Sequence, residues 1–388
     1  MKPPHRVIAG GGSVGPFGRH ADASLAELAR PVIAAALGRA GLDARDVQAA
    51  FVGNAFGGAL QNQESILGQV LLAPAGIAGV PVHTIKNACS SGADAVHLAW
   101  SAVAYGQYDC VLALGAEKLN HPEKARAFAA LASATDHPPI GEGRSVFMDI
   151  NAERAKAYMA CHGAEARHFA LVAAKNRRHA ALNPNAALRE VATAEAILAD
   201  KLVVAPLTRG MCGGLSDGAA AVVLISEDFA RRKGIAGPFI AASAVVSGIP
   251  GGNGSASATK RAGEAAFAQA GIAPGEISLS EVHDPTSPQE LFDIEELSLA
   301  PPGGGIRLIE DGATALGGRL PVNVSGGLIA RGHPVGATGV AQIAEIAEQL
   351  MGQAGARQVE GAKIGLAQMA GGLLGPDSAV AAVHILVR

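Results

Sequence analysis

The sequence predicts an α/β protein made of two copies of one α/β unit, with helices on both faces of its sheets. The segment AALGRAGLDARDVQAAFVGNAF from Ala35 aligns without gaps with AAFAQAGIAPGEISLSEVHDPT from Ala265. Continuous apolar runs such as AAAVVLIS at Ala219–Ser226 are typical of strands that are buried on both faces. We therefore expect one copy in residues 1–230 and a second copy in residues 231–388.

Each of the two aligned segments contains the same order of elements. A helix ends at a glycine, Gly41 in the first copy and Gly271 in the second, and a short acidic turn and a strand follow. Glycine is favoured at the end of a helix because it adopts positive φ without steric cost. The pair of segments therefore predicts an equivalent helix–turn–strand unit in each copy.

The next pair of segments predicts a strand, a turn of small residues and a long helix. PVHTIKNACSSGADAVHLAW begins at Pro81, and PVNVSGGLIARGHPVGATGVAQIAEIAEQL begins at Pro321. Each is followed by a further strand, YDCVLALGAEK from Tyr108 and AKIGLAQMAGG from Ala362. The two turns carry Cys89 and His333, and they can face each other if the copies pack about a pseudo-twofold axis.

The first copy is longer than the second, and its excess lies at about residues 120–211. This region contains helical stretches such as MDINAERAKAYMACHG. We interpret it as an inserted lobe near a ligand site, because long insertions in compact domains are often functional. The alternative is a surface insertion without a role in binding.

Composition and charge exclude several classes of function. The chain has 388 residues, of which 49% are hydrophobic, 17% charged and 4% aromatic, and its net charge is −3. These values argue against a nucleic-acid-binding protein, and no apolar run is long enough to cross a membrane. The N-terminus lacks the apolar core of a signal peptide, and the four cysteines have no CxxC spacing, so we expect a cytoplasmic protein. We also expect no metal, because no His or Cys spacing fits a site.

Cys89 is the strongest candidate for a nucleophile. It lies where a helix begins, and the N–H groups and dipole at that end would lower the pKa of a thiol. Ser90, Ser91 and Gly92 are small and leave room above the sulfur. His333 would be the basic partner that a cysteine nucleophile needs. The alternative for Cys89 alone is a small buried apolar residue.

The chain resembles a thiolase over nearly its whole length. NACSSG is similar to the nucleophile segment of that family, SDGAAAVVL at Ser216–Leu224 to its mid-chain segment, and VLALGAEKLN at Val111–Asn120 to the strand before its loop domain. The most specific similarity is NVSGGLIARGHPVGATG at Asn323–Gly339. EVHDP at Glu281–Pro285 is similar to the sterol-carrier-linked and archaeal branch.

The resemblance implies a fold and a mechanism. The expected fold has two βαβαβαββ halves in a five-layered αβαβα sandwich, with an inserted loop domain and a dimer or tetramer, in some relatives with a small accessory subunit. The expected activity in lipid metabolism is ping-pong acyl transfer, with CoA thioesters as substrates and no cofactor. Cys89 would be acylated with the help of His333, and His283 and His333 would bind a thioester oxygen. The N–H groups of Cys89 and Gly371 would hold the oxyanion.

The sequence departs from the family at the second catalytic cysteine. The two positions that the family uses are occupied here by Met369 and Pro285, which cannot transfer a proton. Three interpretations remain open. The protein is a thiolase with another base at the α-carbon, or an acyltransferase that condenses decarboxylatively with its Cys-His-His set as ketoacyl synthases do, or an inactive scaffold subunit. The identity of the acyl chain and the direction of the reaction are open too.

Residues for binding the rest of CoA are predicted from two segments. Lys175, Arg177, Arg178 and His179 in AAKNRRHAALNP are candidates for the phosphates, although a solvated helix face explains them equally well. Ser243 and Ser247 lie in a segment that in the resembled family is near the pantetheine. We expect Cys212 to be structural and Asp284 to orient its surroundings.

Overall fold

The computed structural model describes residues 5–136, 145–251 and 256–388, so residues 137–144 of the predicted lobe lie outside the described part. The elements of the first half, without the lobe, are β1 (Val7–Val14), α1 (Leu25–Arg39), β2 (Ala49–Gly53), α2 (Gly57–Gln61), α3 (Leu67–Leu72), β3 (Val82–Ile85), α4 (Ser91–Ala104), β4 (Cys110–Lys118), β7 (Asp217–Ser226) and α9 (Glu227–Lys233).

The lobe is mainly helical, whereas the second half contains both helices and strands. The lobe contains α5 (Lys124–Ala132), α6 (Val146–His162), α7 (Ala166–Ala181), α8 (Ala194–Leu198), β5 (Leu202–Val204) and β6 (Leu207–Thr208). The second half contains β8 (Phe239–Ser247), α10 (Ala258–Ala270), β9 (Leu279–Glu281), α11 (Ser287–Glu296), α12 (Gly304–Glu310), the π-helix η5 (Gly327–Arg331), α13 (Val335–Leu350), β10 (Ile364–Leu374) and β11 (Asp377–Val387).

The strand order is the same in both halves. Nine of the described strands form one mixed sheet in the order β3-β2-β4-β7-β1-β8-β11-β10-β9, and β5 and β6 of the lobe form a separate two-stranded sheet. Within the nine-stranded sheet, the strands of the two halves join where Ile8 of β1 pairs with Phe239 of β8. Counted outward from this junction, β1-β7-β4-β2-β3 is matched by β8-β11-β10-β9, and Val322 bridges Ser280 of β9 where β3 lies in the first half. The repeat in the sequence is therefore a repeat in topology.

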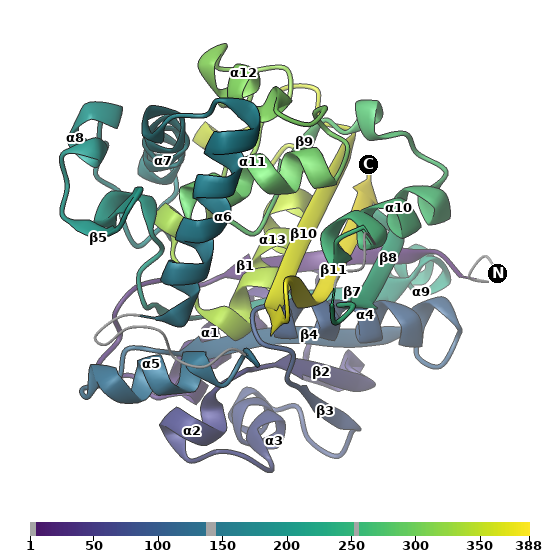
Figure 1. Ribbon diagram of the computed structural model, residues 1–388. Helices are drawn as coiled ribbons and strands as arrows, with labels where there is room; N and C mark the ends of the chain where they lie inside the picture. The colour runs from purple at the N-terminus through teal and green to yellow at the C-terminus, as the bar shows by residue number, and fades with distance from the viewer. Residues whose placement is uncertain (1–4, 137–144, 252–255) are drawn as a thin grey trace.

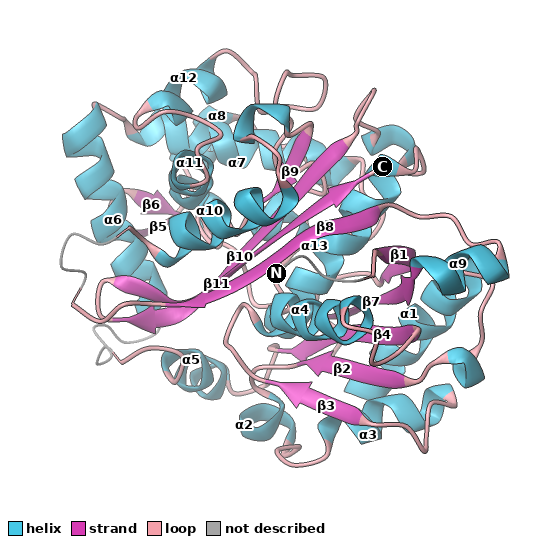
Figure 2. Cartoon of the chain, turned by 90° about the vertical axis from the view of Figure 1, so that its right-hand side faces the viewer, coloured by secondary structure: helices cyan, strands magenta, loops and turns pink. Residues whose placement is uncertain are grey.

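The elements are arranged in five layers. Helices α4 and α13 pack on each other and on strands of both halves, so they form a central layer between the two groups of strands (Figure 2). Helices α1 and α3 cover the outer face of the first half, and α10 covers the outer face of the second. The central layer is apolar, with side chains such as Val96, Val340 and Ile343 fully buried. This is the five-layered α/β arrangement that the sequence predicts.

Small residues allow the two central helices to approach closely at their N-terminal ends. A Cβ on Gly92 would lie 2.5 Å from the carbonyl oxygen of Gly336, and a Cβ on Gly339 would lie 2.3 Å from the amide nitrogen of Ala93. Such distances exclude any side chain at these positions. Because Cys89 and His333 precede these helices, the close crossing brings the two predicted turns together.

The lobe lies against both halves. Helix α5 packs on α2, whereas α7 packs on α11, α12 and η5 of the second half. Figure 1 shows α5, α6, α7 and α8 gathered at one side of the sheets. Among the described residues, no helix combines the length and the hydropathy that crossing a bilayer requires.

Candidate active site

The turn before α4 fixes the position of Cys89. Ala88 has a φ of 47°, in the left-handed region that L-residues adopt at an energetic cost. Two hydrogen bonds hold this turn: the N–H of Asn87 donates to Oγ of Ser91 at 2.8 Å, and the N–H of Ser90 donates to the carbonyl of Asn87 at 3.0 Å. Cys89 therefore lies at the N-terminal end of α4 with its side chain partly exposed.

The turn before α13 orients His333. Its Nδ1 lies 2.8 Å from Oγ1 of Thr338, whose hydroxyl can donate to the carbonyl oxygen of Pro334 at 3.0 Å. In that arrangement, Oγ1 accepts the proton of Nδ1, so Nε2 carries a lone pair. Nε2 is buried and has no hydrogen-bond partner. It is therefore available as a base.

The segment after β9 places His283 beside His333. The N–H of His283 donates to Oε1 of Gln368 at 2.9 Å, which ties this segment to β10. The two imidazole rings are 5.5 Å apart between centroids and meet edge to face. Side-chain nitrogens of His283 and His333 and the sulfur of Cys89 all lie within 4.8 Å of one another. The structure thus brings together the three predicted catalytic residues from both halves of the chain.

The pKa of the thiol differs from the expectation. Burial raises the pKa of Cys89 to about 12, the amide of Gly372 lowers it by donating to the sulfur, and the charge of Glu117 raises it further. The expected lowering of this pKa at the helix end is therefore wrong, because desolvation of the sulfur outweighs the hydrogen bonds from the amides of Gly372 and Cys89. Burial lowers the pKa of His283 to about 3 and that of His333 well below its ordinary value. At neutral pH the site holds a thiol and two neutral imidazoles.

A cavity of about 740 Å³ opens at these three residues. Its wall is mainly apolar, and the lobe supplies much of it through Phe128 of α5 and Phe147 and Met148 of α6. Pro285 also lines the cavity, whereas Met369 is buried in the core. The lobe thus borders the site, as predicted, and neither position of the missing cysteine carries a titratable group.

The glycines of β10 approach the turn that carries Cys89. A Cβ on Gly371 would lie 2.4 Å from the carbonyl oxygen of Asn87 and 2.8 Å from the amide nitrogen of Ser90. The amide that reaches the sulfur belongs to the next residue, Gly372. The role of Gly371 as an oxyanion donor stays a prediction, and Gly372 is a second candidate for it.

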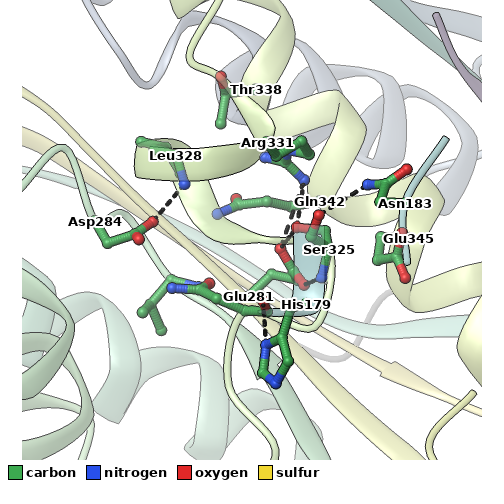
Figure 3. A network of polar contacts seen from close by, with 12 residues as sticks. His179, Asn183, Glu281, Asp284, Ser325, Leu328, Arg331, Thr338, Gln342 and Glu345 are labelled. Atoms are coloured by element: carbon green, nitrogen blue, oxygen red, sulfur yellow. Dashed lines mark hydrogen bonds and ion pairs between the residues drawn. The ribbon is translucent and has the colours of Figure 1, made fainter. Parts of the chain in front are cut away.

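A buried polar network supports the two histidine segments (Figure 3). Asp284 accepts the N–H of Leu328 at 2.7 Å and Nδ2–H of Asn176 at 2.8 Å. A Cβ on Gly327, whose φ is 61°, would lie 2.3 Å from the carboxylate of Asp284, so only glycine fits there. Burial and the charge of Glu290 raise the pKa of Asp284 well above its ordinary value. Asp284 therefore orients its surroundings, as expected.

The same network continues through a buried ion pair. Arg331 lies 3.5 Å from Glu281, and both side chains are almost fully buried. Ser325 donates from its hydroxyl to Glu281 at 2.6 Å and accepts from Arg331 at 3.0 Å. Separating such a pair would leave an uncompensated charge in the interior and destabilise the folded protein, so the two side chains are held together. The pair fastens the segment before His283 to the segment before His333 (Figure 3).

Glu117 of β4 is a further buried carboxylate beside the site. It accepts the N–H groups of Ala55 at 2.8 Å, Phe56 at 3.3 Å and Gly336 at 3.2 Å, and Nδ2–H of Asn54 at 2.9 Å. Burial raises the pKa of Glu117 to about 7 although these bonds lower it. Since Gly336 lies in the first turn of α13, Glu117 fastens the His333 turn to the first half.

The residues predicted for the rest of CoA lie outside this cavity. Ser243 lies between the imidazoles of His97 and His384, at 2.9 Å from each, and Ser247 is exposed at the end of β8. Arg177 donates to the carbonyl of Glu190, and Arg178 is exposed on α7. Their roles in binding CoA stay predictions, without support from the lining of the cavity.

Lys175 and His179 in the same segment are buried instead of solvated. Lys175 forms an ion pair with Glu290 at 2.5 Å, and His179 contacts the carbonyl of Asn323 at 3.0 Å. Both predictions for these two residues, phosphate binding and a solvated face, are therefore wrong. They stabilise the contact between α7 and the second half.

Comparisons with known proteins agree with this geometry. A family model described as "Thiolase, N-terminal domain" matches residues 7–192, and one described as "Thiolase C-terminal domain-like" matches residues 253–387. The chain is 37% identical over 377 residues to an acetyl-CoA acetyltransferase of Methanothermobacter thermautotrophicus, covering 96% of this chain and 97% of the relative. The chain belongs to the thiolase family.

Two further relatives are a protein named as a thiolase subunit and a sterol carrier protein, whose branch of the family the sequence resembles. Benzoylsuccinyl-CoA thiolase subunit BbsB of Thauera aromatica is 34% identical, with 93% of each chain covered. Human sterol carrier protein 2 is 34% identical over 82% of this chain and 61% of its own length. A solved structure titled "Ltp2-ChsH2(DUF35) aldolase" has a TM-score of 0.81 at 24% identity, covers 100% of this chain and 99% of that chain, and has the same fold. The predicted thiolase fold and the prediction of an acyltransferase enzyme are thus confirmed at the level of the family.

Two residues of this thiolase site were not predicted from the sequence. Glu117 lies in a predicted strand, and Arg154 of α6, which lines the cavity, lies in a predicted helix, but the sequence pattern assigns a role to neither. An isolated Glu in the apolar run VLALGAEK is a usable signal, because a carboxylate in a buried strand needs several donors. Arg154 has no comparable signal in the sequence.

Proposed function

We propose that this thiolase transfers acyl groups between CoA thioesters through an acyl–Cys89 intermediate, cleaving 3-ketoacyl-CoA or condensing acetyl-CoA. The observation that carries the proposal is the unpartnered Nε2 of His333 in a group of Cys89, His283 and His333 whose reactive atoms lie within 4.8 Å. The acetyl-CoA acetyltransferase relative supports the acetyl group as one substrate. CoA thioesters would be substrates, and no cofactor is needed for this chemistry.

The first half-reaction uses the neutral pair of side chains. His333 takes the proton of the Cys89 thiol as the sulfur bonds to the thioester carbonyl carbon. The bond between that carbon and the CoA sulfur breaks, and the CoA thiolate receives the proton from His333. Because burial holds both groups neutral, the ion pair forms only with substrate present, when the developing oxyanion meets the amides of β10.

The second half-reaction differs between the two directions. In condensation, a base removes a proton from the α-carbon of acetyl-CoA, and the resulting enolate attacks the acyl carbon and releases the Cys89 sulfur. His283 is the candidate for holding the enolate oxygen, because its Nε2 is buried and has no partner. In cleavage, the Cys89 sulfur attacks the 3-keto carbon of 3-ketoacyl-CoA instead of a thioester carbon. The bond between that carbon and the α-carbon breaks, and the released enolate of acetyl-CoA takes up a proton. CoA thiol then attacks the acyl–Cys89 carbonyl, and the Cys89 sulfur leaves with the proton of that thiol.

A second candidate function is decarboxylative condensation. It is favoured by Pro285 and Met369 at the two positions where thiolases of the resembled branches have their second cysteine. In that reaction a malonyl thioester loses CO₂, and the enolate forms without a base. Two neutral imidazoles suffice to bind its oxygen.

The test is incubation of the protein with acetyl-CoA and longer acyl-CoAs, followed by intact-protein mass spectrometry and peptide mapping. An acyl group on Cys89 that is absent from the Cys89→Ser variant supports both enzyme functions. No adduct from any donor would favour an inactive scaffold. Acetoacetyl-CoA with free CoA then tests cleavage, and malonyl-CoA with acylated enzyme tests for CO₂ release.

The role of His283 is separable from that of His333. His283→Ala should lower the rate of carbon–carbon bond cleavage more than the rate of acylation, whereas His333→Ala should lower both by about 10²–10⁴-fold. Equal losses in the two steps for His283→Ala would contradict this division.

We also propose that the protein is a homo-oligomer, a dimer or tetramer, with a possible small accessory subunit. The relative from Thauera aromatica is named as a subunit, which supports an assembly of more than one chain. Light scattering on the purified protein measures the mass of the assembly, and a monomer would overturn this proposal.

A further inference from the structure

Arg154 is a cation on the cavity wall that forms no ion pair with a carboxylate of the described residues. It projects from α6 of the lobe, is partly buried, and lines the cavity together with Cys89 and His283. Its Nη1 lies 3.5 Å from Oε1 of Gln289, which is the limit of a hydrogen bond. Within the described ranges, no Asp or Glu oxygen lies within the 4.0 Å of an ion pair from it.

The charge of Arg154 acts on its surroundings from a distance. It lowers the pKa of His283, whose imidazole faces the same cavity. It also favours ionisation of Asp293 and Glu296 of α11, but burial dominates and raises the pKa of both carboxyls. Oδ2 of Asp293 has no hydrogen-bond partner, so this carboxyl does not bind the guanidinium. Among the residues that the structure describes, none therefore neutralises this guanidinium at the cavity wall.

A guanidinium in this environment is suited to one kind of ligand. Arginine binds planar anions such as carboxylates with two parallel hydrogen bonds, and such pairs are stronger where water is excluded. The neighbouring wall is apolar, with Phe128, Phe147 and Met148 from the lobe. An aliphatic chain fits this wall, and an acidic end group fits Arg154.

We propose that the cavity prefers acyl-CoA thioesters whose acyl chain ends in a carboxylate, with Arg154 as the specificity-determining counter-ion. This inference rests on the proposed acylation of Cys89 and names the substrate class for it. The apolar wall binds the methylene groups between the thioester and the carboxylate. A methyl end group of the same chain length would leave the guanidinium without an anion and is disfavoured.

A phosphate of CoA is the other anion that Arg154 could meet, and the experiment distinguishes the two. The acylation rate is measured for pairs of donors of equal chain length: succinyl-CoA with butyryl-CoA, glutaryl-CoA with pentanoyl-CoA, and adipyl-CoA with hexanoyl-CoA. The wild type, Arg154→Met, Arg154→Lys and Arg126→Met are compared. Arg126 is an exposed residue of α5 outside the cavity lining, and its variant removes the same charge.

The quantity compared is the ratio of kcat/KM for the acidic donor to that for the neutral donor. Any change that Arg154→Met causes in the pKa of His283 affects both donors of a pair and cancels in this ratio. We expect the wild type to favour the acidic donor at one chain length at least. Arg154→Met should lower that ratio at least about tenfold, mainly through KM, which is the effect of losing about one charged hydrogen bond. Arg154→Lys should retain part of the preference for acidic donors, and Arg126→Met should have the same ratio as the wild type.

Each other outcome has a defined meaning. An equal loss for acidic and neutral donors in Arg154→Met would assign the residue to a CoA phosphate and overturn the proposal. A wild-type ratio below one at every chain length would overturn it as well. If acetyl-CoA and the neutral donors acylate Cys89 without any preference for acidic donors, only this inference fails. If no donor acylates Cys89, the proposed function itself fails.

Discussion

The carboxylate of Asp284 accepts the backbone N–H of Leu328 at 2.7 Å. His283 directly precedes Asp284, and Leu328 belongs to the π-helix that ends two residues before His333. This hydrogen bond therefore links the segments that carry the two imidazoles, in addition to the ion pair of Glu281 and Arg331. The distance between the rings depends on a residue that contacts neither the thiol nor the cavity.

Replacement of Asp284 tests this link. Asp284→Ala should lower the free energy of unfolding by about 1–3 kcal/mol, because it leaves a buried N–H without an acceptor. It should also slow carbon–carbon cleavage, since the π-helix is free to shift relative to His283. Asp284→Asn keeps an acceptor oxygen and should retain most of the stability and most of the cleavage rate. Urea unfolding and steady-state kinetics measure the two effects, and a fully stable Asp284→Ala protein would contradict the argument.

The pKa of about 12 for Cys89 predicts its reactivity toward alkylating reagents. The rate of its reaction with iodoacetamide should rise about tenfold per pH unit between pH 7 and pH 10, because only the thiolate reacts. Peptide mass spectrometry follows Cys89, with the exposed Cys161 as a reference in the same sample. A rate that is already constant near pH 7 would mean that a thiolate–imidazolium pair exists without substrate.

The buried Glu117 predicts a change in stability with pH. Its pKa is 4.5 in the unfolded chain and about 7 in the folded protein, so the folded protein retains a proton that the unfolded chain releases between these values. Stability contributed by this group therefore falls as pH rises through that window. Relative to Glu117→Gln, the wild type should lose about 3 kcal/mol of unfolding free energy between pH 4.5 and pH 7.5.

If the unfolding free energies of the wild type and of Glu117→Gln change equally with pH in that range, Glu117 is not the titrating group. The variant should also be less stable than the wild type at acid pH. The NH₂ group of glutamine would face some of the N–H donors that the carboxyl now accepts. Chemical denaturation at each pH measures both quantities.

We predict that the hydroxyl of Thr338 orients the imidazole of His333. Thr338→Val removes the hydroxyl that lies 2.8 Å from Nδ1 of His333. The loss of one hydrogen bond of about 1 kcal/mol, and of the tautomer that it favours, should slow acylation of Cys89 about tenfold. Thr338→Ser restores the hydroxyl and should restore the rate. The rate of acyl-adduct formation is measured by quenched-flow mass spectrometry for each protein. The prediction is wrong if Thr338→Val is acylated as fast as the wild type.

The duplicated α/β unit and the pairing of Cys89 with His333 were predictable because both copies kept a recognisable pattern, whereas the five layers and the role of His283 were implied by the resemblance to thiolases. The strand–turn–helix units at Pro81 and Pro321 are similar enough to show that Cys89 and His333 occupy equivalent turns. Equivalent turns in a duplicated α/β unit meet where the central helices cross, and the structure places them there. This part of the prediction needed only local sequence and symmetry.

The features of the site that the sequence did not predict depend on contacts between residues far apart in the chain. The pKa of Cys89 is set by burial and by Gly372 and Glu117, which no local pattern around the cysteine reveals. Lys175 has the sequence context of an exposed helical residue, yet it pairs with Glu290 from the second half. Arg154 lines the cavity, as Arg209 does, whereas Arg126 is exposed outside it, and no local sequence pattern distinguishes these arginines. Periodicity identifies which elements form, but not which polar residue meets which.

The arrangement has a consequence for the order of synthesis. The nucleophile belongs to the first half of the chain, and both imidazoles belong to the second. While the ribosome is still making the second half, the nascent chain exposes a thiol that has no base and no closed pocket. On the proposed mechanism, Cys89 can be acylated only once both histidine segments have been synthesised and α4 and α13 have packed together, so its reactivity would report that the two halves have joined.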